Sequence, residues 1–281
     1  MARKVILSRK GFDGTTGGKP SPIIDDKFVS LPIPRADSGD YYKKFRYSPT
    51  ENYLKVMKDL GINLYSEAHL DPDLKRTTLK ERDKKWRGLF GQAGISQGTL
   101  HNRGVGKDDI FLFFGWFKEA RKLNGTWKYR ADAPDIHAIF GYLEVDRVLD
   151  IKARNPVPSW TKYHPHIKGR REYGTQRNSV YMATPLFSKD SNKQGWGSFE
   201  YNKQLVLTKD GEKNRSMWML PPCFQGEQNS FTHAIKTWNV MPNGWIEMQT
   251  NGRGDQEVFI SSNPQVVEWA EQLITSCSIY E

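Results

Sequence analysis

Two apolar runs dominate the pattern of hydrophobic and polar positions along the chain. The first covers residues 110–117 and the second residues 137–145, and both are rich in aromatic and branched side chains. Gly, Asp or Pro residues bound each run, and each is too short for a helix that is packed on all sides. We therefore predict two neighbouring core strands, separated by a polar turn at Asn124 and Gly125 and a break at Pro134.

Shorter apolar segments and two helical patterns complete the predicted fold. Residues 5–8 and 28–34 read as short strands, and a helix is expected to start near residues 48–51 and to end before Gly61. A last helix is expected from Asn263 and Pro264 to about Ser276. We predict a single α+β domain over residues 1–281. The two apolar runs, 110–117 and 137–145, resemble the barrel strands of PUA-like domains. This resemblance implies a mixed central sheet that is partly barrel-like, with flanking helices and long basic loops.

The charge balance narrows the choice of partner. The 281 residues include 42 Lys and Arg against 32 Asp and Glu, giving a formal charge of +10 and a pI near 9.4. Such an excess favours a polyanion, most often nucleic acid. Only two cysteines occur, Cys223 and Cys277, in no metal-ligand spacing. No apolar run approaches membrane-spanning length, so we expect a cytoplasmic protein with no membrane partner.

A glycine-rich loop follows the first strand and brings cations and a carboxylate together. It contains Arg9, Lys10, Asp13 and Lys19. Exposed amides beside cations suit phosphate, although no Gly-Lys-Ser/Thr triplet makes this a P-loop. The simpler interpretation is a surface loop that needs positive φ at several positions. We nevertheless regard Asp13 as a candidate catalytic group, because a carboxylate placed where a polyanion binds is costly without a function.

The segment His69-Leu70-Asp71-Pro72-Asp73 places an imidazole and two carboxylates within five residues. Such a group can act as acid and base around a scissile bond, or can bind a divalent metal. Asp-Pro-Asp is also a common helix-entry turn, in which an aspartate merely caps. Since no further ligand is identified, we predict neither a metal nor another cofactor.

Basic and aromatic residues gather in the irregular stretch 155–184, which we expect to grip a nucleic-acid strand. The candidate contacts in it are Lys168, Arg170, Arg171, Tyr173 and Arg177. Its His164-Pro165-His166 segment is interpreted as positional or phosphate-facing rather than metal-binding. Gln92, in an amide-rich stretch over 88–101 taken as a loop, is a candidate reader of a base edge. A second glycine-rich loop, 251–257, offers Arg253 and Glu257.

Several blocks, taken together, resemble the third of the nucleotide-modification-associated domain families of phages and bacteria. The residues that carry the resemblance are 7–13 (LSRKGFD), 20–23 (PSPI), 31–34 (LPIP), 69–74 (HLDPDL), 88–92 (GLFGQ), 109–117 (DIFLFFGWF), 137–143 (HAIFGYL) and 256–259 (QEVF). The resemblance covers nearly the whole chain. It implies an α+β domain connected with modified bases in DNA, in the setting of phage–host conflict, and it does not settle a reaction.

The leading hypothesis is a DNA glycosylase that flips a modified base and hydrolyses its N-glycosidic bond, a reaction that needs no cofactor. Asp13 is the first candidate for the carboxylate, with Arg9 and Lys10 on flanking phosphates. Asp71 with His69 is the second candidate, and Glu257 with Arg253 is the third. One alternative is a PUA-like reader that binds a modified base and cuts nothing. The other is a transferase in base modification, although no donor fingerprint is present.

Overall fold

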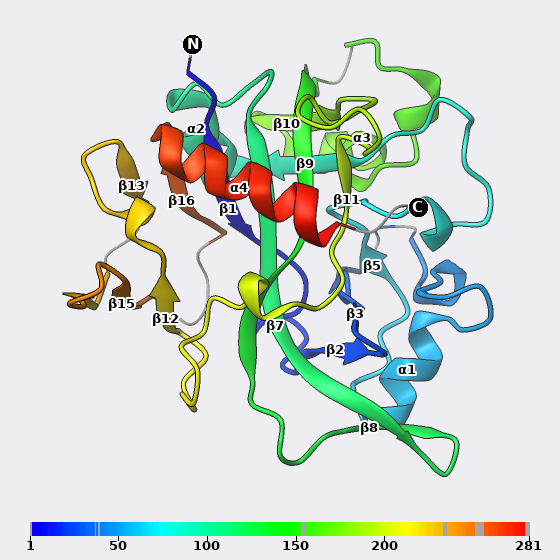
Figure 1. Cartoon of the computed structure of the whole chain (residues 1–281). Helices are drawn as coiled ribbons and strands as arrows, with labels where there is room; N and C mark the ends of the chain where they lie inside the picture. Colours follow the sequence, from blue (N-terminus) through cyan, green and yellow to red (C-terminus); the bar gives the residue numbers. More distant parts are fainter. Residues whose placement is uncertain are drawn as a thin grey trace.

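Two long antiparallel strands form the centre of the structure (Figure 1). In this computed structural model, which describes residues 2–36, 38, 40–152, 155–232, 235–250 and 256–278, β7 (Ile110–Leu123) pairs with β9 (Ile136–Asp150). The predicted pair of core strands is therefore confirmed. Residues 110–115 are all buried, which explains why this stretch is apolar at every position instead of alternating. Both strands continue beyond the apolar runs as partners of β8 (Thr126–Tyr129) and β10 (Asn178–Ala183).

The main sheet is mixed. Its strands follow the order β13-β16-β1-β7-β9-β10-β6; β1 and β2 run parallel to β7, and the other pairs are antiparallel. The α+β class is confirmed, and over the described residues this path runs from β13 to β6 without closing into a barrel. The remaining strands are β1 (Val5–Arg9), β2 (Ser21–Ile24), β3 (Lys27–Phe28), β4 (Ile33–Pro34), β5 (Ala68–His69), β6 (Leu89–Ala93), β11 (Trp196–Ser198), β12 (Met217–Leu220), β13 (Asn229–Phe231), β14 (Thr237–Val240), β15 (Ile246–Gln249) and β16 (Glu257–Ser261).

The described helices are α1 (Tyr53–Asp59), α2 (Gly94–Asn102), α3 (Pro165–Lys168) and α4 (Pro264–Cys277), with short 3-10 turns between elements. The last predicted helix is confirmed: the side chain of Asn263 accepts a hydrogen bond from the Gln265 amide, and α4 packs on β1 (Figure 1). Helix α1 begins at Tyr53, after the predicted start near residues 48–51, because the side chain of Asn52 caps it by accepting a hydrogen bond from the Lys55 amide. No helix in the described part of the chain is long and apolar enough to cross a membrane.

Two stretches that were expected to be loops are partly regular. Residues 88–101 form β6 and most of α2, joined at Gly94, whose φ of +63° favours glycine. The stretch 155–184 folds into short helical turns and then enters β10. The apolar residues of this stretch explain its folding, because Ile167 and Val180 are buried with Leu89 in a third, smaller hydrophobic cluster. Helix α3 consequently lies against β6 and β10.

Candidate functional site

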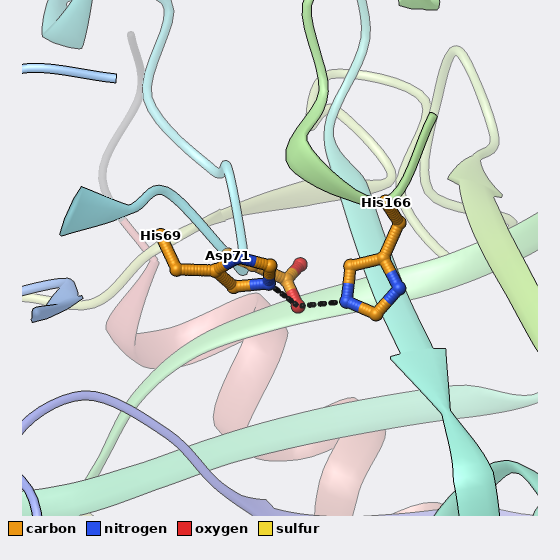
Figure 2. Close-up of side chains that lie close together, drawn as sticks. All are labelled: His69, Asp71 and His166. Atoms are coloured by element: carbon orange, nitrogen blue, oxygen red, sulfur yellow. Dashed lines mark ion pairs between the residues drawn. The ribbon is translucent and has the colours of Figure 1, made fainter. Parts of the chain in front are cut away.

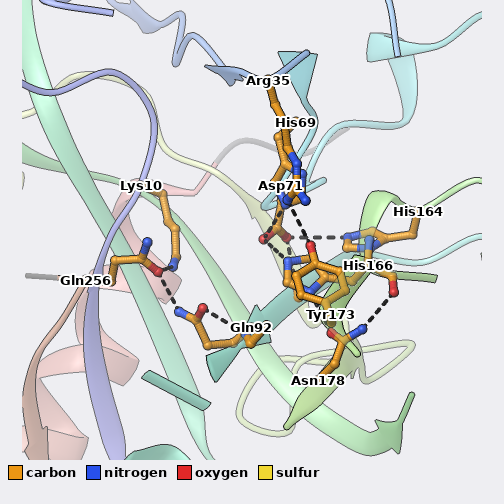
Figure 3. Close-up of polar contacts among 12 residues, drawn as sticks. Lys10, Arg35, His69, Asp71, Gln92, His164, His166, Tyr173, Asn178 and Gln256 are labelled. Atoms are coloured by element: carbon orange, nitrogen blue, oxygen red, sulfur yellow. Dashed lines mark hydrogen bonds and ion pairs between the residues drawn. The ribbon is translucent and has the colours of Figure 1, made fainter. Parts of the chain in front are cut away.

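A pocket of about 370 Å³ opens where the first glycine-rich loop, β5, β6 and the segment after α3 meet (Figure 3). Its wall is mainly polar and carries both signs of charge. The polar residues on it are Arg9, Lys10, Asp13, Thr15, Thr16, Arg35, His69, Asp71, Gln92, His166, Tyr173, Gln176 and Gln256. Pockets that bind small molecules commonly enclose roughly 300–1,000 Å³, so this one suits a single compact ligand.

Asp71 lies at the centre of a cluster of imidazoles in this pocket. Its Oδ2 atom is 3.6 Å from Nε2 of His166 and 3.9 Å from Nε2 of His69 (Figure 2). Its Oδ1 atom accepts a 2.8 Å hydrogen bond from the amide of Gly91 and lies 3.4 Å from Nε2 of His164. The carboxylate is buried, yet its described neighbours include no arginine or lysine partner.

The segments that build this cluster are positioned by β6. The backbone of Asp73 bridges to Leu89, which brings the turn after β5 against the start of β6. From the other side, α3 delivers the ring of His166 onto Gly91. A Cβ atom at position 91 would lie 2.3 Å from Cδ2 of His166, so only glycine allows this approach without displacement.

Hydrogen bonds fix the orientation of two rings. The amide nitrogen of Asn178 donates to the carbonyl of His166 at 2.9 Å, which leaves its oxygen to accept from Nδ1 of His166 at 2.7 Å. Nδ1 of His164 accepts from the backbone amide of His166 at 3.4 Å. In the neutral rings, His166 therefore turns an Nε2 lone pair toward Asp71, whereas His164 turns an Nε2 proton toward it.

The charges of the cluster follow from burial. Desolvation lowers the pKa of His69 well below its usual range, and it lowers the pKa of His166 to about 4. Burial alone would raise the pKa of Asp71, but the surrounding imidazoles, His164 foremost, bring it below its usual value. At neutral pH the cluster thus consists of an ionised carboxylate facing two uncharged imidazoles.

Tyr173 and Arg35 close one side of the pocket. The Tyr173 ring stacks on His166, with centroids 4.9 Å apart and planes 12° apart. Arg35 donates to the Tyr173 hydroxyl at 3.0 Å and also pairs with Glu172 at 2.7 Å. The guanidinium therefore stands at the rim, next to the imidazoles, where it can contact an anionic ligand.

The opposite wall holds a second polar network. Gln92 donates to Gln256 at 2.9 Å and to the buried Glu257 at 2.5 Å, and Lys10 lies 3.4 Å from Glu257. Arg9 is also nearly buried, with its guanidinium 5.5 Å from the Phe114 ring centroid. Glu257 thus holds Lys10 and Gln92 in place from behind the wall.

The structure brings most of the predicted site residues to this pocket. Asp13, His69, Asp71, Arg9, Lys10, Gln92 and Tyr173 line it, and Glu257 lies directly behind it. The Oδ1 atom of Asp13 accepts three hydrogen bonds within its own loop, from the amide and hydroxyl of Thr15 and the amide of Thr16, each 2.7 Å. Asp13 is therefore a rim residue that also shapes the loop.

Other predicted contacts lie outside the pocket. Arg170, Arg171 and Arg177 line a groove of about 960 Å³ that shares Tyr173 and Gln176 with the pocket. Lys168 pairs with Asp40 at 2.7 Å, and Lys19 is exposed away from both hollows. Arg253 lies outside the described residues.

Sequence reasoning missed the part played by His166, Arg35 and Gln176. The His164-Pro165-His166 segment was noticed, but its distance along the chain from His69 hid the contact between them. Gly91 carried a usable signal, since a glycine within a strand often marks a close approach.

A pocket lined by Arg9, Lys10 and Arg35 beside a basic groove is typical of proteins that bind a phosphate-bearing ligand. The sequence matches the nucleotide modification associated domain 3 over residues 4–260, and the chain therefore belongs to that family. The resemblance seen in the sequence is confirmed, and membership connects the protein with nucleotide modification. Neither the curated proteins nor the solved structures include a match to this chain.

Proposed function

We propose that this protein is a DNA glycosylase that draws a modified nucleotide into the pocket and hydrolyses its N-glycosidic bond. The observation that carries the proposal is the buried, ionised carboxylate of Asp71, which faces the neutral imidazoles of His69 and His166 in a pocket that Arg9, Lys10 and Arg35 also line. Phosphates of the flipped nucleotide meet Arg9, Lys10 and Arg35. The transition state for loss of a base is cationic at the sugar, and Asp71 is the group that stabilises it.

The reaction balances with water alone. The oxygen of a water molecule bonds to C1′ of the sugar, and the C1′–N bond breaks with its electron pair passing to the base. One proton of the water is accepted by the cluster of Asp71, His69 and His166, and a proton is returned to the departing base. The product is an abasic site and a free base.

The proposal ranks Asp71 ahead of the other two carboxylates. One oxygen of Asp13 is engaged by three donors of its own loop, so this side chain is better suited to shaping the phosphate-binding rim. Glu257 anchors Lys10 and Gln92 from behind the wall. We assign Glu257 a positioning role.

The surroundings of the pocket suit a DNA strand and an extruded base. The groove of Arg170, Arg171 and Arg177 meets the pocket at Tyr173, so a backbone that lies in the groove can deliver a nucleotide to it. Ile95, at the start of α2, is 92% exposed and lies in a hollow that Gln92 and Gln256 also line. Apolar side chains in such positions wedge into a base stack, and Ile95 is placed to occupy the gap that the flipped base leaves.

The test is base release from DNA. Plain DNA and phage DNA carrying glucosylated hydroxymethylcytosine are incubated with the protein, with freed base detected by mass spectrometry and abasic sites by alkali cleavage. We expect release from the modified DNA alone and its loss in Asp71→Asn. Asp132→Asn, which changes a carboxylate that is 67% exposed, serves as the matched control and should retain activity.

The outcomes separate the competing functions. If Asp71→Asn released the base as fully as the wild type, the cluster of Asp71, His69 and His166 would not be the catalytic site. Tight binding of modified DNA by the wild-type protein, with no product after long incubation, would replace the glycosylase with a reader of modified bases.

A further inference from the structure

Three potential metal ligands converge in the pocket from two separate segments of the chain. One ring nitrogen each of His69 and His166 and a carboxylate oxygen of Asp71 lie within 4.8 Å of one another, and all three residues are buried (Figure 2). The Nε2 atoms of His69 and His166 lie 3.9 and 3.6 Å from Oδ2 of Asp71. Ligands of a transition metal bind at about 2.0–2.2 Å, so a small inward movement of each side chain places an ion between them.

The hydrogen bonds around the cluster leave a position that a cation fills. Asn178 fixes the proton of His166 on Nδ1, and the Nε2 lone pair then faces the carboxylate oxygen with no proton between them. Two acceptors that face each other in a buried site repel unless a cation lies between them. This arrangement matches a ligating histidine whose other ring nitrogen donates to a supporting group.

The carboxylate of Asp71 is also held in place by groups that are not ligands. Its Oδ1 accepts from the amide of Gly91 at 2.8 Å and faces Nε2 of His164, while Oδ2 is directed at His69 and His166. His164 turns a proton, not a lone pair, toward Asp71, so it is a positioning residue and not a ligand. His69, Asp71 and His166 all line the pocket, so water and substrate can reach an ion that these three residues bind.

We propose that His69, Asp71 and His166 bind one divalent transition-metal ion at the base of the pocket. Two imidazoles and one carboxylate favour ions such as Zn²⁺, Fe²⁺ or Co²⁺ over Mg²⁺ and Ca²⁺, which prefer all-oxygen sites. Such an ion supplies a Lewis acid and an activated water in the pocket. This inference goes beyond the proposed glycosylase, and binding of the ion can be measured whether or not a base is released. With the ion bound, the ring nitrogens of His69 and His166 serve as ligands and not as proton acceptors, and the ion would activate the water in their place.

The test uses untagged protein that has been treated with a chelator and then desalted. Co²⁺ is titrated while its visible absorption is recorded, and Zn²⁺ stoichiometry is measured by mass spectrometry after a second desalting. We expect one ion per chain and a Co²⁺ spectrum characteristic of mixed nitrogen and oxygen ligands. His166→Gln and Asp71→Asn should each abolish stoichiometric binding, while circular dichroism reports whether each variant is folded.

Two further variants sharpen the assignment. Asn178→Ala, which removes only the support of His166, should weaken Co²⁺ affinity by about 10- to 100-fold and alter the spectrum. His101→Ala, an exposed histidine outside the cluster, should bind one ion as the wild type does. Absence of stoichiometric Co²⁺ and Zn²⁺ binding by the wild type would overturn the inference, as would unchanged binding by folded His166→Gln and Asp71→Asn. Base release that persists after metal is removed would show that the glycosylase reaction does not require the ion, and the metal site would then be judged by the binding measurements alone.

Discussion

Asp71 and Asp73 stand two residues apart, and both carboxylates are buried, but their surroundings differ in kind. Asp73 is fully enclosed and is neutralised by Arg82, whose two terminal nitrogens each lie 2.7 Å from one of its oxygens. The Tyr163 hydroxyl donates a further 2.7 Å bond to Asp73. Asp71 has the Gly91 amide and imidazoles for neighbours, and it lines the pocket.

The contrast teaches what distinguishes a structural carboxylate from a candidate reactive one. A guanidinium keeps its charge at every accessible pH, so the pair of Asp73 and Arg82 is permanent and leaves no room for a ligand. Imidazoles can gain, lose or share a proton, and their lone pairs can bind an ion. The negative charge of Asp71 can therefore interact with a substrate or a cation that enters the pocket.

The largest expected effect comes from changing each carboxylate to its amide. Asp71→Asn should lower base release by roughly 10²- to 10⁴-fold, because the charge that stabilises the transition state is lost. Its thermal midpoint should change little, since the amide oxygen can still accept from Gly91 and its NH₂ group can donate to His166. Base release and thermal unfolding are the two measurements.

Asp73→Asn should behave in the opposite way. It leaves the guanidinium of Arg82 buried without its counter-charge, which costs about 3–5 kcal/mol of unfolding free energy. For a chain of this size, that loss lowers the melting temperature by about 5–8 °C. Folded Asp73→Asn protein at low temperature should retain base release. A reversal of these two phenotypes would invalidate the distinction between the carboxylates.

The sequence predicts the scaffold better than the site, and the reason is visible in particular residues. The strands β7 and β9 could be predicted because burial of both faces makes the apolar runs nearly continuous. The group of His69 and Asp71 could be recognised because its members are neighbours in the chain. His166 could not be joined to it, since the contact depends on how α3 packs on β6.

The roles of the two aspartates after β5 were equally hidden. Nothing in the local sequence tells that Arg82 turns back to Asp73, or that Asp71 receives no such partner. The loop of Asp13 illustrates the same difficulty, because a carboxylate beside cations can cap its own turn and line a pocket at once. Which side chain neutralises or contacts each aspartate is decided by tertiary packing.

Gly91→Ala tests how closely His166 must approach Asp71, without removing any functional group. The added Cβ would lie 2.3 Å from Cδ2 of His166 and must push that ring away from Asp71. We expect base release to fall by roughly 100-fold, as displacements of about 1 Å do, and stability to fall by about 1–3 kcal/mol. Co²⁺ affinity and base release are the readouts.

Gly98→Ala is the matched control for this change. Apart from the backbone of its own helix and its chain neighbours, no atom lies within 4 Å of a Cβ at position 98. The residue is inside α2, so alanine should raise stability by about 0.5–1 kcal/mol. Equal losses of activity in both glycine variants would show that the strand position of Gly91 has no special role.

His137 is a histidine of the core, and it can be compared with the histidines that line the pocket. This ring lies in the core, where its Nδ1 accepts from the Trp218 indole at 3.0 Å, and burial first, then Arg9 and Arg215, hold its pKa well below the usual value. The unfolded chain therefore binds a proton below about pH 6.5 that the folded chain refuses, so stability falls as the pH decreases. The expected contribution is about 1.4 kcal/mol per pH unit, measured as the urea midpoint between pH 7.5 and 5 on metal-free protein. His137→Gln should reduce that slope by this contribution and leave the part due to His69 and His166, whose pKa values are also lowered. An unchanged slope would place the titration on other groups.

The smallest expected effect concerns Ile95, which separates base extrusion from chemistry. The side chain is 92% exposed, so Ile95→Ala should leave stability within about 0.5 kcal/mol of the wild type. Release from duplex DNA should fall about 10-fold, because a smaller wedge holds the base stack open less well. Release from single-stranded DNA, where no stack must be opened, should be unchanged.

Leu64→Ala, which truncates another exposed apolar residue, is the control. A drop of equal size on both substrates would place Ile95 in substrate binding, and no drop on either would remove the wedge from the mechanism while leaving Asp71 and its imidazoles in place.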